Sequence, residues 1–171
     1  SMPAAYIVAA ARTAGGKKGG ALKDWHPADL GAAVLDSLVE RAGIDPAGVE
    51  DVIAGCVGQV GEQSFHIGRN MVMASSLPDH VPAVTIDRQC GSSQQFTGAE
   101  MIARNYQMSR EELDAFALES HRRAAAATER GDFDQEIVPL AVVDADGNER
   151  QHTRDEGIRF DASPEGFAAL K

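Results

Sequence analysis

Cys90 lies where a cysteine can act as a nucleophile. It follows the apolar stretch VPAVTID at 81–87 and precedes Gly91-Ser92-Ser93. If a helix begins at Gly91 or Ser92, its unpaired N–H groups and the positive end of its dipole face the sulfur and favour the thiolate over the thiol. The thiolate is the nucleophilic form of cysteine, and the small residues beside it leave space for an acyl group. On local sequence alone, Cys90 is either such a nucleophile or a small buried apolar side chain.

The other groups that could do chemistry lie in less specific settings. Cys56 is inside an apolar stretch from Ile53 to Val60, which favours a structural role. Trp25 is expected to anchor a loop, and the glycine-rich stretch 15–20 matches no phosphate-loop pattern, so an ordinary surface loop is expected there. The five histidines have no metal-like spacing, so we expect surface or capping positions and no metal site; they are His26, His66, His80, His121 and His152.

Composition disfavours several classes of protein. The net charge of −10 argues against nucleic acid and anionic membranes as partners, and it means that a polyanionic ligand must be met by local donors. No apolar run approaches the roughly 20 residues that span a bilayer, and the first residues do not resemble a secretory signal. Two cysteines make no disulfide framework, so a cytoplasmic location is expected.

Strands and helices alternate in the first half of the chain. Three apolar stretches predict buried strands, at 6–11, 51–57 and 81–87. Between them, one helix is opened by His26-Pro27 and ended by Gly43, and a second is predicted from Phe65 to Ser75. This alternation predicts an α/β sheet with helices on its faces, whose last strand runs directly into Cys90.

The second half has a different character. Ser109-Arg110-Glu111-Glu112 is a capping box, and it predicts a helix that fades near Gly131. The stretch 134–143 and the Asp146-Gly147 turn predict a hairpin. We therefore expect two units, at 2–95 and 96–171.

Several stretches together resemble one family. AYIVAAART at 5–13, VIAGCVGQVGEQ at 52–63 with GRN after it, and above all VTIDRQCGSSQQ at 84–95 are similar to the N-terminal half of thiolases. The stretches SREELDAFALESHRRAAAATERGDFDQEI and RDEGIRF resemble the loop domain of that family. The matches follow the family's order and cover nearly the whole chain.

The resemblance implies a thiolase-like, five-layered α/β/α/β/α fold. Here it would include only the N-terminal half, with 2–95 an incomplete core domain and 96–171 part of the loop domain that binds coenzyme A. It implies no permanently bound cofactor, with coenzyme A or acyl-CoA as substrate. The reaction would be thiolysis of a 3-ketoacyl-CoA, or the reverse Claisen condensation, by a ping-pong mechanism through an acyl thioester on Cys90. Arg159 in RDEGIRF matches a position against the adenine of coenzyme A, and the family implies a homodimer or homotetramer with 56–69 near the interface.

Departures from the family pattern keep other functions open. The chain contains neither the family's Gly-His-Pro histidine nor its second catalytic cysteine, and GSSQQ runs straight into FTGAEM, which predicts a missing segment between Gln95 and Phe96. Alternatives are a ketoacyl synthase of the same superfamily, or a catalytically dead thiolase-like module for dimerisation or binding. The acyl chain of the substrate, and the direction of the reaction, stay open.

Overall fold

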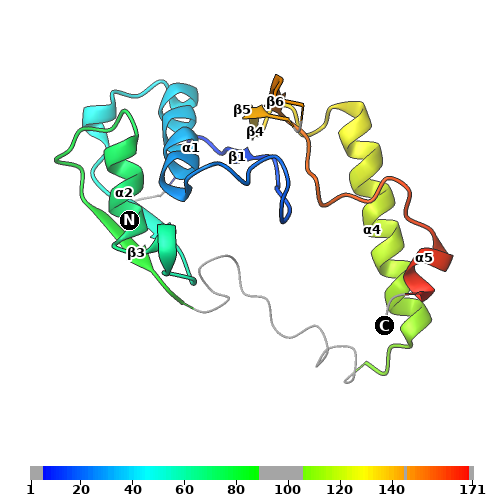
Figure 1. The fold of residues 1–171 in the computed structure, drawn as a ribbon. Helices are drawn as coiled ribbons and strands as arrows, with labels where there is room; N and C mark the ends of the chain where they lie inside the picture. Colours follow the sequence, from blue (N-terminus) through cyan, green and yellow to red (C-terminus); the bar gives the residue numbers. More distant parts are fainter. Residues whose placement is uncertain (1–5, 89–105, 145, 170–171) are drawn as a thin grey trace.

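The computed structural model describes residues 6–88, 106–144 and 146–169. The helices are α1 (Pro27–Ala42), α2 (Ile67–Ala74), α4 (Arg110–Arg130) and α5 (Pro164–Ala168), with short 3-10 turns η1 (Pro46–Gly48) and η2 (Gly61–Gln63). The strands are β1 (Arg12–Thr13), β2 (Val52–Gly55), β3 (Ala83–Ile86), β4 (Ile137–Val138), β5 (Leu140–Val143) and β6 (Glu149–His152). In Figure 1, α1, α2 and β3 lie on one side, α4 and α5 on the other, and β4 to β6 between them.

The described strands form three two-stranded sheets. β2 and β3 are parallel, with Val52 opposite Ala83. β1 and β4 are also parallel, with Arg12 opposite Ile137, so a strand from the start of the chain pairs with one from its second half. β5 and β6 are antiparallel and form the hairpin that the Asp146-Gly147 turn predicts.

The core of the first half lies between the β2–β3 sheet and the two helices that cover it. Val52, Val72, Leu77 and Val81 are buried there, and Leu35 of α1 packs against them. Gly68 allows α2 to approach the sheet closely, because a Cβ at this position would lie 3.0 Å from the carbonyl oxygen of Val84 and 3.1 Å from Cβ of Ala54. The predicted helix-covered sheet is therefore present, with shorter strands than the sequence pattern suggests.

The N-terminal apolar stretch corrects one prediction. Residues 6–11 were expected to be a strand buried on both faces, but only Arg12 and Thr13 pair as a strand. Tyr6 and Ile7 are 83% and 93% exposed. They line an apolar groove together with residues of α1 and β2, among them Leu35 and Ile53. The side chains have apolar neighbours on one side only, which explains why the expected burial is not reached.

The two long helices, α1 and α4, begin and end where local sequence predicts. The His26 Nδ1 accepts the N–H of Ala28 at the start of α1, and Gly43 ends that helix with a positive φ of 63°. At α4 the capping box is complete: the Ser109 hydroxyl accepts the N–H of Glu112, whose carboxylate accepts the N–H of Ser109. Caps satisfy N–H groups that a helix leaves unpaired.

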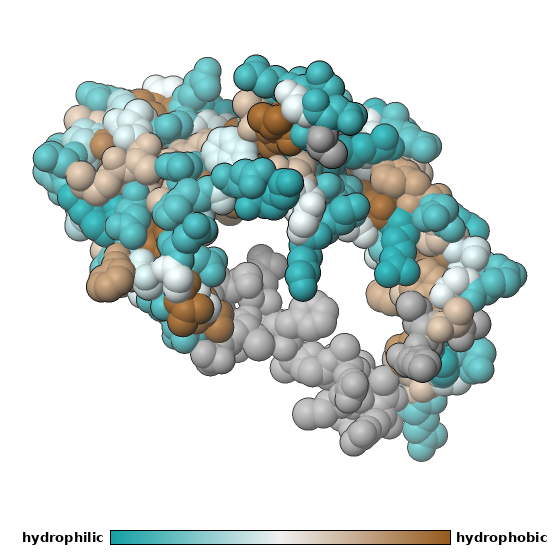
Figure 2. Space-filling model, in the orientation of Figure 1, coloured by the Kyte–Doolittle hydropathy of each residue, from teal (hydrophilic) through white to brown (hydrophobic). Residues whose placement is uncertain are grey.

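The surface shown in Figure 2 is mainly hydrophilic, with apolar residues gathered in small groups. In the described part of the chain, no helix combines the length and apolar character needed to cross a bilayer.

Candidate functional site

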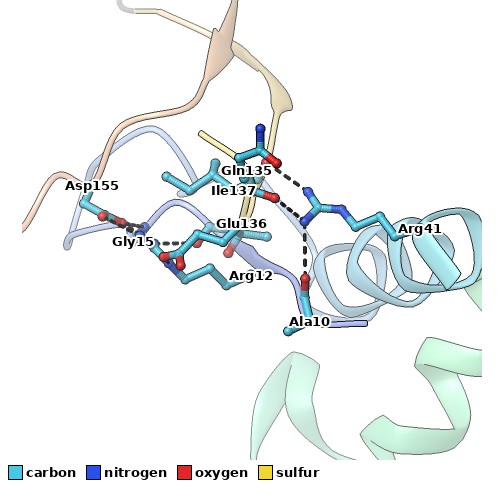
Figure 3. Close-up of polar contacts among 9 residues, drawn as sticks. Ala10, Arg12, Gly15, Arg41, Gln135, Glu136, Ile137 and Asp155 are labelled. Atoms are coloured by element: carbon cyan, nitrogen blue, oxygen red, sulfur yellow. Dashed lines mark hydrogen bonds and ion pairs between the residues drawn. The ribbon is translucent and has the colours of Figure 1, made fainter. Parts of the chain in front are cut away.

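A salt bridge joins the start of the chain to its last third. Arg12 in β1 donates to both carboxylate oxygens of Asp155, at 2.8 and 3.0 Å, and its Nε donates to Glu136 at 2.6 Å (Figure 3). Bidentate pairing of this kind fixes the orientation of both groups. Because Asp155 lies in RDEGIRF, the Arg12 contact fixes the position of the segment 154–160, which is called the strap below.

The pairing shifts the titration of both groups. The hydrogen bond from Arg12 holds the pKa of Asp155 below its ordinary value, assisted by an N–H of Gly15 that donates to the same carboxylate at 2.6 Å. The hydrogen bond to Asp155 in turn raises the pKa of Arg12. Both groups are therefore charged at neutral pH.

The glycine-rich loop folds around the next residue of the strap. The Glu156 carboxylate accepts the N–H groups of Ala21 and Lys17, at 3.0 and 3.3 Å, and its own N–H donates to the carbonyl of Gly15 at 2.9 Å. Gly20 permits this approach, since a Cβ there would overlap the carboxylate. The loop therefore binds carboxylates of its own chain, in agreement with the expectation that it is not a phosphate loop.

Arg41 of α1 extends the same connection. Its guanidinium donates to the carbonyls of Ala10, Gln135 and Ile137, at 3.2, 2.5 and 3.4 Å (Figure 3). These carbonyls belong to the segments that form and precede β1 and β4. The paired strands are thereby attached to α1, and the strap is attached to β1 through Arg12.

Arg159, the predicted adenine contact, lines a pocket of about 410 Å³ against α4. Small and apolar residues of α4 form part of its lining, and the chain at 159–164 contributes the rest apart from two charged residues of α4. Two arginines, Arg122 and Arg159, line the pocket, and Arg122 also pairs with Glu119 at 3.5 Å. The other lining residues are Leu118, Ala125, Ala126, Glu129, Phe160, Ala162, Ser163 and Pro164. Within the described ranges the Arg159 guanidinium forms no ion pair, so it is available to a ligand.

The backbone of Arg159 is fixed to α4. Its N–H donates to Nδ1 of His121 at 3.2 Å. The ring of His121 lies 5.9 Å from that of Phe167 in α5, and the guanidinium of Arg154 lies 4.2 Å from the Phe160 ring centroid. Helix, strap and α5 therefore hold the pocket wall together.

Cys90, the predicted nucleophile, lies outside the described residues, as does the predicted domain boundary at 95/96. The strand that leads toward it is present, and it ends at Ile86. Cys56 is half-buried directly after β2, and its N–H donates to the carbonyl of Ile86 at 3.0 Å, which agrees with a structural role.

Histidine positions were predicted only in part. His26 and His66 cap helices as expected. His152 was expected at the surface, but it is 1% exposed, and its Nε2 has no hydrogen-bond partner among the described residues. Its place opposite Leu140 on the inner side of the hairpin explains the burial. Among the described residues, no group of histidine, cysteine, aspartate and glutamate could hold a metal ion.

Sequence reasoning missed the roles of Asp155, Glu156 and His121. The only local signal was that the two carboxylates stand beside Arg159 in RDEGIRF. Their partners are more than 100 residues away in the case of Arg12 and Ala21, so the pairing follows from the fold.

Comparisons with known proteins agree on one family. The family model described as "Thiolase, N-terminal domain" matches residues 5–98 and 96–171. A steroid 3-ketoacyl-CoA thiolase of Mycobacterium tuberculosis is 36% identical, over 81% of this chain and 50% of that protein. A 3-ketoacyl-CoA thiolase of Cronobacter sakazakii is 35% identical, over 99% of this chain and 58% of that protein. The chain thus spans about half the length of these relatives.

The structural comparison gives the same result. The acetyl-CoA acetyltransferase of Bacillus anthracis superposes with a TM-score of 0.83 at 28% identity, covering 96% of this chain and 57% of that one. The predicted α/β, thiolase-like fold is confirmed for the N-terminal portion.

An internal gap also emerges from the alignments. Alignment with the Cronobacter protein runs over 223 positions, and this chain has 171 residues, so at least 52 positions (223 − 171) are filled only in the relative. The two pieces matched by the family model meet at 96–98. This agrees with the segment predicted to be missing between Gln95 and Phe96.

Proposed function

The chain belongs to the thiolase family, and on that premise we propose that it is the N-terminal part of an acyl-CoA C-acyltransferase of lipid metabolism. The reaction is thiolysis of a 3-ketoacyl-CoA to acetyl-CoA and a shortened acyl-CoA, or the reverse condensation. The observation that carries the proposal is the pocket beside Arg159, which has the size and chemistry for the nucleotide end of coenzyme A.

The pocket suits an adenine nucleotide for two reasons. Its apolar lining and the ring of Phe160 offer surfaces on which a base can stack, and a planar guanidinium such as that of Arg159 stacks on aromatic rings. Arg122, whose guanidinium also pairs with Glu119 at 3.5 Å, is a second cation beside the pocket that could meet a phosphate. In a chain of net charge −10, such local cations are what a polyanionic ligand requires.

The covalent step is assigned to Cys90. Its thiolate attacks the 3-keto carbon of the substrate, the bond between C2 and C3 breaks, and acetyl-CoA leaves after its carbanion takes a proton. The sulfur of coenzyme A then attacks the acyl thioester and releases Cys90. The resemblance assigns the proton transfers to the Gly-His-Pro histidine and the second cysteine, neither of which is in this chain. Splitting one carbon–carbon cleavage into two steps is the advantage of a covalent intermediate.

The assembly is proposed to be a homodimer or homotetramer, and the location cytoplasmic. Support for an interface comes from 56–69, where Val57, Val60 and Phe65 are 47%, 77% and 94% exposed. Apolar side chains grouped on a surface are typical of contacts between subunits. Light scattering that gives a monomer at micromolar concentration contradicts the assembly.

Titration of the chain with coenzyme A in a calorimeter tests the nucleotide site. Arg159→Ala is expected to weaken binding about tenfold, since the guanidinium on which the adenine would stack is lost. Arg123→Ala is the matched control, because Arg123 pairs with Glu119 and does not line the pocket. Equal affinities for the two variants, or no binding by the parent chain, would contradict the assignment.

A further inference from the structure

We propose that Asp155 is a positioning residue: its pairing with Arg12 sets where the Arg159 pocket lies relative to the core of the first half. This inference rests on the proposed function for its consequence, because a coenzyme A held in that pocket must extend toward the core. The structural part of the proposal, the fixing of α4, stands without it.

One end of the strap is anchored on the first half of the chain. Asp155 receives two N–H groups from Arg12 and one from Gly15, and Glu156 receives those of Lys17 and Ala21. The Asp155 side chain is 17% exposed and that of Arg12 36%, so the carboxylate is largely shielded from water and the guanidinium is partly exposed. Shielded, bidentate contacts hold geometry better than exposed ones.

The other end of the strap is anchored on α4. Only Gly157 and Ile158 separate Glu156 from Arg159, whose N–H is bound by His121. A residue spans at most about 3.6 Å, so the backbone of Arg159 lies within about 11 Å of that of Glu156. The short linkage lets the anchor on Arg12 constrain the pocket wall.

The strap gives α4 its second attachment. The first is at the end of the helix, where the chain passes through Gly131 and continues into β4, which pairs with β1. A helix attached only at its C-terminal end can change its direction relative to the rest of the fold. His121 lies nine residues before Arg130, about 14 Å along the helix at 1.5 Å per residue. Attachment at both points fixes the direction of α4.

Loss of the anchor should therefore displace the pocket without dismantling it. The pocket is lined by α4 and the segment at 159–164, and these remain joined through His121. A ligand that occupies only the pocket should bind as before. A ligand that must also reach the core should bind more weakly. In a smaller fraction of molecules, the pocket and the core are then at the distance and orientation that the ligand spans.

Distance measurements between spin labels test the fixing of α4 directly. Labels are placed at the exposed positions Glu40 in α1 and Glu111 in α4, after mutation to cysteine, with both native cysteines replaced by serine. The parent should give one narrow distance distribution, and Asp155→Asn a broad one. Glu136→Gln is the matched control, since it removes a carboxylate from the same guanidinium and leaves the strap intact. An Asp155→Asn distribution as narrow as that of the parent overturns the proposal.

Calorimetry with two ligands tests the consequence. In Asp155→Asn, the affinity for adenosine 3′,5′-bisphosphate should stay within twofold of the parent, whereas that for coenzyme A should fall about three- to tenfold. Asp155→Glu, which retains the charge, should restore part of the loss. Equal losses for both ligands would mean that Asp155 only stabilises the pocket, and no loss would mean that it positions nothing; either overturns the proposal. If the parent binds neither ligand, the proposed function fails, and the spin-label distances still decide the role of Asp155.

Discussion

Nδ1 of His121 accepts the backbone N–H of Arg159 at 3.2 Å, which ties the proposed adenine contact to the middle of α4. The histidine thus contacts the strap, where the sequence predicted only a surface or capping position. It holds the backbone from which the Arg159 side chain extends.

Replacing His121 by alanine is predicted to weaken coenzyme A binding about three- to tenfold, because Arg159 then samples orientations that do not face the pocket. His121→Asn, whose side-chain oxygen can also accept an N–H, should retain more affinity than alanine. Calorimetric titration of the two variants provides the comparison. Identical affinities for parent and alanine variant would show that the contact is dispensable.

The Arg12–Asp155 pair predicts an acid-sensitive contribution to stability. Because the folded state holds the pKa of Asp155 below its ordinary value, the contribution is present above the unfolded pKa of about 4 and is lost as pH falls through the folded value. We expect about 1 kcal/mol at neutral pH, since Arg12 is partly exposed. Urea unfolding of the parent and Asp155→Asn should show this difference at pH 7 and a smaller one at pH 3. A difference that is unchanged at pH 3 would exclude the ion pair as its source.

Gly20→Ala is predicted to destabilise the chain by about 1–2 kcal/mol, because the added Cβ forces the Glu156 carboxylate away from the N–H groups of Lys17 and Ala21. Gly48→Ala is the control, since no atom lies within 4 Å of a Cβ at Gly48. Thermal unfolding of both variants measures the effect. A Gly20 variant as stable as the Gly48 variant would mean that Glu156 adjusts freely.

Acetylation is predicted on Cys90 and not on Cys56, which lies half-buried after β2. The parent protein, restored to the length of its relatives, is incubated with acetyl-CoA and digested. The mass of each cysteine-containing peptide is then measured by mass spectrometry. Cys90→Ser serves as the control and should carry no acetyl group. Acetyl mass on Cys56 with Cys90 unmodified would refute the assignment, and no acetylation at either site would favour the catalytically dead alternative.

If the segment missing between Gln95 and Phe96 normally covers part of the core, its absence should leave apolar surface exposed to solvent. The groove lined by Tyr6, Ile7 and Ile53 is expected to bind a dye such as ANS in the present chain. Inserting the segment that the Cronobacter relative carries between the positions of Gln95 and Phe96 should reduce the fluorescence. A shuffled segment of the same length is the control. Equal dye binding by all three proteins would show that the segment does not cover the groove.

Sequence reasoning located most elements because their signals are local. Gly43 and Gly131 end helices, Ser109 starts one, and Trp25 donates to the carbonyl of Ala141 as a loop anchor. The predicted burial of a strand at 6–11 was wrong. An apolar pattern shows that a segment can be buried in a sheet, but whether it is buried depends on neighbouring strands from other parts of the chain.

In the candidate site, too, sequence reasoning identified the residue with a local signal and missed those whose contacts depend on the fold. Arg159 was singled out through a short motif, and it lines a pocket in the structure; its contact with adenine stays a prediction. The strap's anchors were not found, because no local pattern links Asp155 to Arg12, which lies 143 residues earlier in the chain.

The pairing of β1 with β4 has a consequence for the order of events during synthesis. Arg12 cannot pair with Ile137, Glu136 or Asp155 until those residues have left the ribosome. At about 5–20 residues per second, this strand waits at least about 6 s for its partners, and longer if the missing segment lies between them. Contacts of such large sequence separation also form slowly. We therefore expect the β1–β4 pair to form after α1 and the β2–β3 sheet, whose contacts are closer together in the sequence.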